Sequence, residues 1–440
     1  MGLGVAIIGC GTVGGAVGRL LSGTNGSPRM RLSSEVELAA VYDRGPHKLE
    51  AAGIDPSLFC GDFEEILKNP SIHVVAELIG GTELARDVVE RSLEAGKDVV
   101  TANKALLAHH GAELLASARA KGRVVAFEAS CAGGIPILRA FYDGLVANQI
   151  DAVYGIVNGT CNFILTEMIE HGRSYSEVLS EAQQMGLAEA DPSLDVSGMD
   201  SAHKIAIMAS LAFGTGVRFE DVSVEGIEDI ELVDVQRGHE LGYVIKLIGA
   251  AVREEGEMAL WVRPAFIAQD HPLAWIRGSF NAVSVYGSAT GHTMYYGRGA
   301  GGDPTASAVV ADIASIASGA YRAAFQSQGL WLDSKTSMEA RPSEARRSRF
   351  YVRLAAEDRS GALAEIASVL GRHDISISSV LQHERGAPDG PYATVVIITN
   401  AVPEGRILKA VYDLENLPCT KGGIRTIAVL DEHPEWGEQS

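Results

Sequence analysis

The chain has 440 residues, of which 46% are hydrophobic and 21% charged, a balance typical of a globular protein with two or more domains. Asp and Glu number 56 against 37 Lys and Arg, giving a formal net charge of −19. This acidity argues against nucleic acid as a partner, because phosphate binding requires clustered basic residues. The five cysteines lack zinc-type spacing, and no signal-peptide or membrane-spanning pattern is evident, so we expect a reduced cytoplasmic protein with no membrane partner.

The first predicted element is a buried strand at residues 5–8, which runs directly into a glycine-rich turn. The turn reads Gly-Cys-Gly-Thr-Val-Gly at 9–14 and opens a predicted helix that extends to residue 21. Between a strand and a helix, this pattern predicts a dinucleotide site, because the glycines let a pyrophosphate approach the helix N-terminus. The cofactor-binding residues expected here are Gly9, Gly11, Thr12, Val13 and Gly14.

A second predicted strand, at residues 36–42, ends at Asp43. An acidic residue at this position is expected to bond the adenosine ribose. Its separation from the glycine turn is longer than the roughly 20 residues usual for the motif, and we assign the excess to a polar insertion at residues 22–34. Arg44, His47 and Lys48 follow and could receive a 2′-phosphate, so NAD and NADP both remain open as cofactors.

Further strands are predicted at residues 74–79, 98–101 and 124–127, alternating with helices. This alternation predicts an α/β fold with a Rossmann-type doubly wound parallel sheet. Open parallel sheets bind ligands at the carboxyl ends of their strands, and four residues there are expected at the cofactor: Gly81, Thr82, Ala102 and Lys104. For Lys104 the alternative is an ordinary exposed lysine. Glu128 could support a cation bound by the carbonyls of the turn that follows, or bond neighbouring amides.

From about residue 139 the pattern changes to mixed helices and strands. Thr160 is a candidate N-cap for a helix at 161–171, although the amides there could equally face a substrate carboxylate. Strands are expected near residue 222 and at 259–267, 283–286 and 294–296, which predicts a second sheet, half buried or used in a subunit contact. A glycine loop at 297–302 precedes a helix expected at 305–320, and could bring Gly301 back to the cofactor.

A carboxylate-rich stretch at residues 182–204 ends in a lysine at the start of an apolar helical run. It contains Glu189, Asp195, Asp200 and Lys204, and the last two, four residues apart, share one helix face. A lysine held among carboxylates beside an apolar helix could bind a polar substrate and supply a proton. The alternative is a capped helix with a surface ion pair, which is common at this spacing.

The last hundred residues predict a separate α+β unit. Residues 333–349 are polar and basic, with Lys335, Arg341, Arg346, Arg347 and Arg349, and we interpret them as a solvated linker. Beyond the linker the predicted order is βαββαβ, a ferredoxin-like motif, with strands and helices at 350–355, 362–372, 375–382, 392–399, 404–414 and 422–429. With the turn Asp358-Arg-Ser-Gly-Ala-Leu363, this unit resembles an ACT domain. The resemblance implies pairing along sheet edges and an amino-acid effector, although Arg359-Ser360 departs from the usual turn.

The stretch at 182–204 resembles the signature of the homoserine dehydrogenases, A-x3-G-L-A-x2-D-P-x2-D-V-x-G-x-D-x3-K, at every fixed position. Supporting motifs stand in the family's order: GCGTVG (9–14), TANKALLA (101–108), FEASCAGGIPIL (127–138), NGTCNFIL (158–165) and GAGG (299–302). The chain departs from the family pattern at Cys10, at Arg298 and in the insertion after Leu21.

The resemblance implies reversible reduction of aspartate 4-semialdehyde to L-homoserine with NADH or NADPH, feedback by threonine, and a homodimer or homotetramer. It implies that Lys204 is the proton donor, that Asp200 binds substrate beside it, and that Lys104 lies between cofactor and substrate. Further substrate contacts implied by the family are Glu189, Asp195, Gly159 and Thr160. A monovalent cation such as Na⁺ would be held by Glu128 with the carbonyls of Cys131, Gly133 and Ile135.

These observations predict a dinucleotide-binding domain at 1–135, completed by about 300–330, and a substrate-binding and dimerisation domain at 136–299. A linker at 331–348 and an ACT domain at 349–430 follow. Two rival functions remain: a dehydrogenase for another amino-acid-derived aldehyde, and an ACT-gated nucleotide sensor without activity. The central stretch lacks a cysteine in an activated context, which argues against a phosphorylating semialdehyde dehydrogenase.

Overall fold

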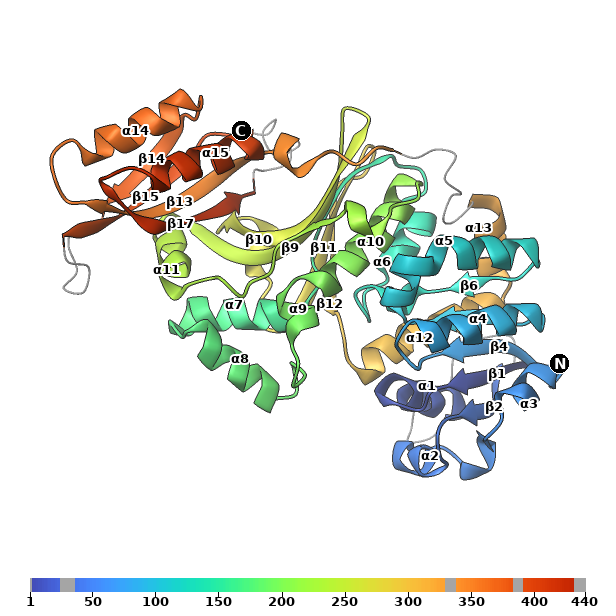
Figure 1. Ribbon diagram of the computed structural model, residues 1–440. Helices are drawn as coiled ribbons and strands as arrows, with labels where there is room; N and C mark the ends of the chain where they lie inside the picture. The colour runs from blue at the N-terminus through green and yellow to red at the C-terminus, as the bar shows by residue number, and fades with distance from the viewer. Residues whose placement is uncertain (1, 24–35, 329–337, 383–390, 431–440) are drawn as a thin grey trace.

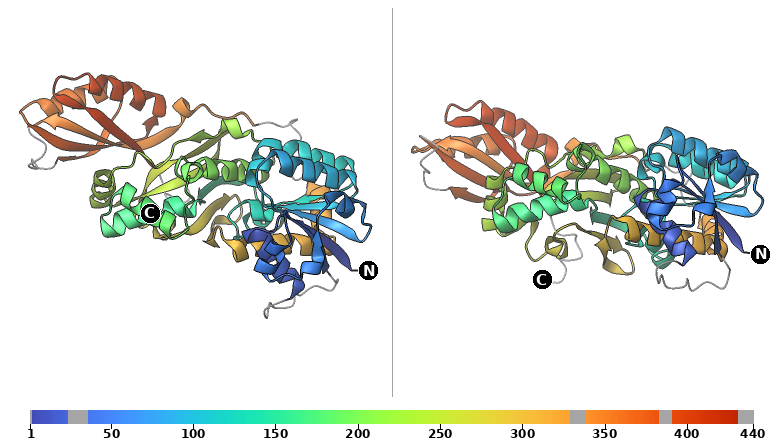
Figure 2. Two further views of the ribbon diagram at one scale, coloured as in Figure 1. Left: turned by 60° about the horizontal axis from the view of Figure 1, so that its bottom comes forward. Right: turned by 90° about the horizontal axis from the view of Figure 1, so that it is seen from below.

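Two β-sheets organise the molecule (Figure 1). The computed structural model describes residues 2–23, 36–328, 338–382 and 391–430. The polar insertion expected at 22–34 therefore lies outside the described residues beyond residue 23, and so does the expected linker up to residue 337. The N-terminal sheet and the C-terminal strands lie at opposite ends of the molecule, with the strands of the middle segment between them (Figure 2).

Six parallel strands form the first sheet, in the order β3-β2-β1-β4-β5-β6. They are β1 (Leu3–Ile8), β2 (Val36–Tyr42), β3 (Phe59–Cys60), β4 (Ile72–Glu77), β5 (Asp98–Thr101) and β6 (Val125–Ala126). Val5 to Ile8 are completely buried, because helices cover both faces of the sheet. These helices are α1 (Thr12–Ser22), α2 (His47–Ala52), α3 (Phe63–Lys68), α4 (Glu83–Glu94) and α5 (Lys104–Ala120). The strand order reverses between β1 and β4, which confirms the predicted Rossmann-type sheet.

Two helices from late in the chain pack onto this first sheet. The helix expected at 305–320 is instead α12 (Gly302–Ala317) followed by α13 (Ala320–Gln328). The break is at Gly319, whose φ of 80° suits glycine. α12 packs against α1, and the Tyr321 hydroxyl of α13 donates to the Val125 carbonyl of β6 at 2.8 Å. The domain boundaries that we expect from the sequence stay a prediction.

The second sheet has eleven strands, with the main order β12-β11-β7-β9-β10-β17-β13-β15-β14. The strands of the middle segment are β7 (Ile150–Ile156), β8 (Ser223–Val224), β9 (Tyr243–Glu254), β10 (Glu257–Ala268), β11 (Phe280–Gly287) and β12 (Gly291–Arg298). The segment also contributes α6 (Ile137–Arg139), α7 (Gly159–His171), α8 (Tyr175–Gln184), α9 (Ser193–Val196), α10 (Met199–Phe213) and α11 (Leu232–Glu240). The sequence did not predict β9, because a mostly apolar run is compatible with either a strand or a helix.

The C-terminal unit has the predicted βαββαβ order, with one additional two-residue strand, β16, before the second helix. Its elements are β13 (Arg347–Glu357), α14 (Ala362–Arg372), β14 (Ile377–Gln382), β15 (Tyr392–Thr399), β16 (Val402–Pro403), α15 (Glu404–Glu415) and β17 (Thr420–Val429). β17 pairs in parallel with β10, with Ala265 opposite Ala428 and Phe266 opposite Val429. The strands of the C-terminal unit therefore continue the sheet of the middle segment within a single chain.

The segment that leads into β13 is not the solvated linker that we predicted. Arg341 lies against the turn between β9 and β10 and pairs with Glu254, Glu255 and Glu257. Arg346 is only 6% exposed, donates to the Ser223 hydroxyl at 2.7 Å, and pairs with Glu404 of α15 at 3.2 Å. These arginines therefore join the C-terminal unit to the middle segment.

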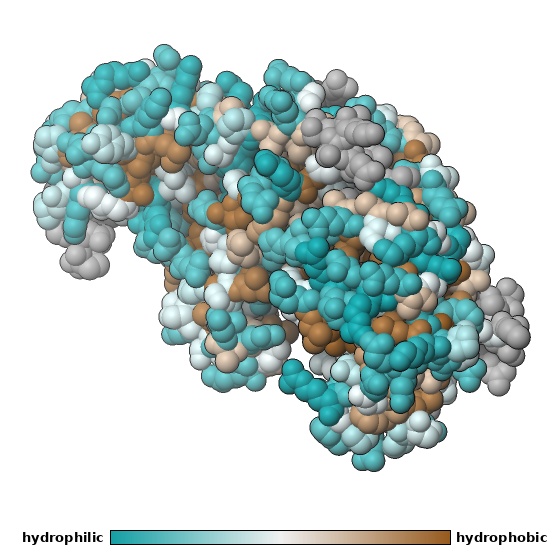
Figure 3. Space-filling model, turned by 45° about the vertical axis from the view of Figure 1, so that its right-hand side comes forward, coloured by the Kyte–Doolittle hydropathy of each residue, from teal (hydrophilic) through white to brown (hydrophobic). Residues whose placement is uncertain are grey.

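The surface and the helices show no membrane-spanning element among the residues that the structure describes. None of the described helices is both long and apolar enough to cross a bilayer. Hydrophilic side chains cover most of the face shown in Figure 3, with apolar residues in small patches between them.

Candidate active site

α10 carries the two residues on which the sequence motif ends. The helix follows Gly198, whose φ of 86° is a conformation that favours glycine. Asp200 lies in the first turn, where the helix dipole stabilises a carboxylate, and Lys204 lies one turn further on. Because nearly all of α10 is enclosed, Asp200 and Lys204 are only 4% and 7% exposed. The alternative of an ion pair on the surface is therefore wrong.

Asp200 binds two lysines at once. One carboxylate oxygen lies 2.8 Å from the Lys204 Nζ atom, and the other lies 2.9 Å from the Lys104 Nζ atom. Lys204 also donates to the Val157 carbonyl at 2.6 Å. The two ammonium groups come from different parts of the chain, since Lys104 begins α5 at the edge of the first sheet. The carboxylate thus joins the first sheet to the middle segment.

The electrostatic balance in this cluster favours charged side chains. Burial acts to raise the pKa of Asp200, but the ammonium groups of Lys204 and Lys104 prevail and hold it well below its usual range. Burial acts to lower the pKa of Lys104, yet Asp200 and the nearby Asp195 carboxylate raise it overall. The pKa of Asp195 is raised by burial and by the charge of Asp200. Asp200 is therefore an anion at neutral pH that pairs with two lysine side chains.

Asn158 ties this cluster to helix α7. Its side chain accepts from the Cys161 amide at 2.8 Å, so Asn158 is the N-cap and the predicted capping by Thr160 is wrong. Its Nδ2 atom donates to Asp195 at 2.7 Å and to Asp200 at 2.9 Å. Thr160 instead donates to the Leu187 carbonyl at 2.8 Å and to Asp195 at 3.3 Å. The motif thus contributes a bridging amide that sequence reasoning missed.

The two remaining predicted substrate contacts, Gly159 and Glu189, differ in their burial and in their distance from the cluster. Gly159 begins α7, and a Cβ atom there would approach the Ser279 carbonyl to 2.7 Å, so the position has room only for glycine. Glu189 is exposed on the loop before α9, and no contact in the described parts of the chain joins its side chain to the cluster. The structure therefore brings together Asp195, Asp200, Lys104 and Lys204, with Thr160 and Gly159 beside them, but not Glu189.

The predicted cofactor residues gather at the carboxyl edge of the first sheet. Gly9 has a φ of 98°, and a Cβ atom on Gly14 would collide with the Gly9 carbonyl. Gly11 faces open space at the N-terminus of α1, where a Cβ atom would meet nothing within 4 Å. A cavity of about 320 Å³ opens beside this turn. It is lined by Val13, Glu77, Leu78, Gly80, Gly81, Ala102, Asn103, Lys104, Ala105, Leu194 and His203.

The other cofactor candidates do not line this cavity, but they lie at or near the ends of the same strands and helices. Thr12 begins α1 and lies close to Gly302, directly after Gly301, so the late glycine loop does return to the first turn. Thr82 precedes α4. Asp43 accepts from the Cys10 amide at 2.7 Å and the Arg44 amide at 2.6 Å. These amides outweigh burial and lower its pKa.

The predicted cation site shows a carboxylate bonded to amides. Glu128 accepts from the Leu138 amide at 3.0 Å and the Arg139 amide at 2.7 Å, which is the second of our two interpretations. Burial and the neighbouring Asp312 raise the pKa of Glu128 to about 8, and burial raises that of the Cys131 thiol to about 12. Among the described residues no group of three or more His, Cys, Asp or Glu side chains could hold a metal.

Two further residues of the cavity escaped sequence reasoning. His203 is 6% exposed, lies against Phe219 with ring centroids 4.6 Å apart, and has a buried Nδ1 atom without a hydrogen-bond partner among the described residues. Burial and His109 lower its pKa to about 4, so the ring is neutral. Glu77 ends β4 completely buried and accepts from the Thr101 hydroxyl at 2.6 Å. Glu77 could have been found from the sequence, because an acidic residue at the end of a buried strand is unusual. His203 could not, because it occupies one of the unspecified positions of the motif.

A nucleotide cavity beside a lysine–carboxylate cluster, with a C-terminal unit of ferredoxin-like order, defines an NAD(P)-dependent oxidoreductase that carries an ACT domain. Sequence profiles agree: the homoserine dehydrogenase profile matches residues 136–314, its NAD-binding domain profile matches 9–128, and the ACT profile matches 350–416. The homoserine dehydrogenase of Pseudomonas aeruginosa is 42% identical over 433 residues, covering 97% of this chain and 98% of that protein. The chain belongs to the homoserine dehydrogenase family.

Solved structures give the same result. The crystal structure of a homoserine dehydrogenase from Thiobacillus denitrificans superposes with a TM-score of 0.90 at 38% identity, covering 98% of this chain and 99% of that one. A hyperthermophilic archaeal homoserine dehydrogenase mutant in complex with NADPH has a TM-score of 0.61 at 25% identity, covering 72% of this chain and 97% of that one. The first comparison extends through the C-terminal unit as well.

Proposed function

We propose that this chain interconverts aspartate 4-semialdehyde and L-homoserine with NAD(H) or NADP(H), as a step in threonine, methionine and isoleucine biosynthesis. The observation that carries the proposal is the buried cluster in which Asp200 holds Lys104 and Lys204 beside the nucleotide cavity. Reduction of an aldehyde requires a hydride at carbon and a proton at oxygen. The bound nicotinamide would supply the hydride, and the cluster offers two ammonium groups as proton sources.

In this proposal Lys204 donates the proton to the substrate oxygen, and Lys104 lies between substrate and cofactor. Asp200 lies within ion-pair distance of both Nζ atoms and fixes their direction, and the Val157 carbonyl accepts a second N–H of Lys204. In the reverse direction Lys204 takes the proton back. Preorganised charges in a buried site are effective because they need not reorient during the reaction. The substrate's polar groups would be bound by Glu189, Asp195, Gly159 and Thr160.

We propose NAD or NADP as the cofactor, held by the first glycine turn and the strand ends around the cavity. The open space at Gly11, Gly80 and Gly81, where a Cβ atom would meet nothing within 4 Å, fits a group that approaches the backbone closely. Asp43 lies next to this turn, which suits a ribose hydroxyl, while Arg44 and Lys48 suit a 2′-phosphate. The residues present are therefore compatible with either cofactor.

We also propose that the turn at residues 131–135 holds a monovalent cation such as Na⁺. Ala132 and Gly133 both have left-handed backbones, with φ of 52° and 49°, which curl the turn. Carbonyl oxygens are suitable ligands for such a hard cation, and those of Cys131, Gly133 and Ile135 belong to this turn. Glu128 lies directly before it, and its buried carboxyl group would contribute negative charge when ionised.

The oligomeric state stays a prediction, and we propose a homodimer or homotetramer. β12 pairs with β11 on one side and ends the main strand order of the second sheet. It carries the partly exposed Met294 and Tyr296. An open edge strand with apolar side chains suits a subunit contact.

An assay with L-homoserine tests the proposed reaction. We expect reduction of NAD⁺ or NADP⁺ when L-homoserine is added, and the comparison of the two cofactors also gives the preference. Other hydroxy amino acids, such as L-serine and L-threonine, serve as controls. Reduction with a different hydroxy compound but not with L-homoserine would point to another dehydrogenase, and no reduction with any of them would point to a nucleotide sensor.

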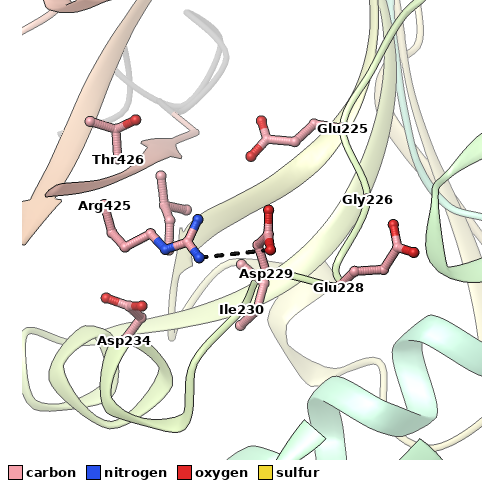
Figure 4. Close-up of a pocket in the computed structure, with 9 residues that line it drawn as sticks. Glu225, Gly226, Glu228, Asp229, Ile230, Asp234, Arg425 and Thr426 are labelled. Atoms are coloured by element: carbon pink, nitrogen blue, oxygen red, sulfur yellow. Dashed lines mark ion pairs between the residues drawn. The ribbon is translucent and has the colours of Figure 1, made fainter. Parts of the chain in front are cut away.

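We further propose that the ACT domain binds an amino-acid effector, with threonine as the first candidate. The support is the joint between this domain and the middle segment, where Arg353 binds Asp234 of α11 through two hydrogen bonds of 2.5 and 3.0 Å. A small cavity of about 80 Å³ lies beside this joint, and Arg425 reaches across it toward Asp229 (Figure 4). A change in the ACT domain can therefore reach α11 directly.

L-threonine is accordingly expected to inhibit the full chain, and Arg353→Met is expected to weaken that inhibition by about fivefold or more, since allosteric coupling usually amounts to 1–3 kcal/mol. The measurement is the threonine concentration for half-inhibition. Arg406→Met is the control, because its partner Asp374 lies in the same domain and both are exposed. If threonine leaves wild-type turnover unchanged, the regulatory proposal is wrong.

A further inference from the structure

A second large cavity lies beside the C-terminal half of α7, apart from the active-site cluster at the beginning of that helix. Its volume is about 500 Å³, within the range of small-molecule sites. It is lined by Thr166, Ile169, Glu170, His239, Val244, Lys246, Gln269, Ala274, Trp275 and Arg277. None of these residues lines the nucleotide cavity or belongs to the Asp200 cluster, so this cavity has no part in the proposed reaction.

Lys246 gives the cavity a buried positive charge. It is only 2% exposed, and its Nζ atom donates to the Asn162 side chain at 2.9 Å and to the Ile276 carbonyl at 2.5 Å. An ammonium group has three N–H donors, and no carboxylate in the described residues lies within ion-pair distance of this one. Burial lowers the pKa of Lys246 to about 8, so it is still mainly protonated at neutral pH. Glu170 attracts this cation only from a distance, and a buried cation with no carboxylate in direct contact among the described residues favours an anionic ligand.

The other walls restrict the chemistry of that ligand. Glu170 and Arg277 form an ion pair of 3.1 Å, and their side chains are 34% and 72% exposed. The cavity therefore presents two cations and one carboxylate, which suits a zwitterion better than a dianion. Its apolar wall is formed by Ile169, Val244, Ala274 and Trp275, and Trp275 is 65% exposed. This wall and the volume suit a long apolar side chain better than a short hydroxylated one.

A chain of hydrogen bonds leads from Lys246 to the active-site cluster. Asn162, which accepts from Lys246, lies in the first turn of α7 and also donates to the Gly278 carbonyl at 2.9 Å. Asn158 caps the same turn and donates to Asp200 at 2.9 Å. A ligand that attracts the Lys246 ammonium group would therefore change the bonds that position the first turn of α7, and with it Asp200.

We propose that this cavity is an allosteric site for an α-amino acid with a long apolar side chain, distinct from the ACT domain. The ligand carboxylate lies near Lys246 and Arg277, its ammonium group near Glu170, and its side chain against Trp275. The binding itself does not depend on the proposed reaction; only its effect on turnover rests on that function.

Calorimetric titration of the full chain with L-leucine and L-methionine tests the site. We expect both to bind at millimolar concentrations or below, and L-threonine and D-leucine to leave the occupancy of this cavity unchanged. Arg277→Ala is expected to weaken L-leucine binding by about tenfold, the loss of about 1.4 kcal/mol. Arg218→Ala is the matched control, because Arg218 is similarly exposed, and neither it nor its partner Asp221 lines the cavity. Lys246→Met should weaken binding further if the variant folds.

Two results would overturn the proposal. One is the absence of L-leucine and L-methionine binding to a folded, full-length chain. The other is binding that Arg277→Ala and Arg218→Ala leave equally strong. A chain that fails to oxidise L-homoserine but binds L-leucine through Arg277 would refute the proposed reaction and confirm the site. Failure of one proposal can therefore be distinguished from failure of the other.

Discussion

Replacement of Lys204 by methionine is expected to lower kcat by about 10²–10⁴-fold, the usual contribution of a positioned acid–base group. Methionine keeps most of the side-chain volume, and Asp200 retains Lys104 at 2.9 Å as a counter-ion, so the fold should persist. The loss should therefore come from the missing proton donor rather than from a collapsed site. The measurement is steady-state turnover of L-homoserine with saturating cofactor.

The affinity for the cofactor distinguishes this explanation from a structural defect. The glycine turn and the strand ends that line the nucleotide cavity do not contact Lys204 in the described structure, so the dissociation constant of NADH or NADPH should stay within about twofold of wild type, a difference of less than 0.5 kcal/mol. Lys121→Met is the control, because that side chain is on the surface and bonds Ser117. Turnover that is unaltered in Lys204→Met would remove Lys204 from the mechanism.

The first sheet was predictable from the sequence because its signals are local. The apolar run before Gly9 identifies a buried strand, and the glycine spacing identifies the turn after it. Small polar residues after the later strands then mark one edge of the sheet, where the structure places Gly81, Ala102 and Lys104. These predictions required only the period of hydrophobic residues and the conformational freedom of glycine.

Features that depend on distant contacts were not predictable in the same way. A buried ion pair and a surface ion pair have the same four-residue spacing, and only the packing around α10 distinguishes them. Thr160 and Asn158 are both good N-caps by residue type, and the structure has Asn158 as the cap, with an amide that also bridges the carboxylates of Asp195 and Asp200. The pairing of β17 with β10 links strands about 160 residues apart in the chain, and a polar linker sequence contains no sign of it.

This continuous sheet gives the ACT domain a rigid connection to the catalytic part. β17 extends the sheet through β10, and Tyr351 of β13 donates to the buried Asp234 of α11 at 3.0 Å. α11 packs on α7 and β9, and α7 begins at the residues that hold Asp195 and Asp200. An effector in the ACT domain and a ligand in the Lys246 cavity would therefore act on the same helix from two sides.

Replacement of Asp200 by asparagine is expected to cost more stability than any other single change in the active-site cluster. Asparagine keeps the shape but leaves the buried Lys204 and the partly exposed Lys104 without the counter-ion that they share. Removing one partner of a buried ion pair typically costs about 3–5 kcal/mol, whereas Asp221→Asn, in a surface pair with Arg218, should cost less than about 1 kcal/mol. Denaturant unfolding of the two variants and wild type at neutral pH measures the difference, and equal losses in both would contradict the proposed role of Asp200.

The pH dependence of this variant gives an independent result. In wild type the folded pKa of Asp200 lies below its ordinary value of 3.8, so the stabilisation is complete above that value and is lost as the pH falls through the folded pKa. Asp200→Asn lacks that acidic loss. It should also lower the pKa of Lys104, because the carboxylate that raises it is gone. Aldehyde reduction that needs a charged Lys104 slows as the pH rises through the pKa of Lys104. The residual activity of Asp200→Asn should therefore fall at a lower pH than the activity of wild type. If both activities fall at the same alkaline pH, Lys104 does not control this part of the pH profile.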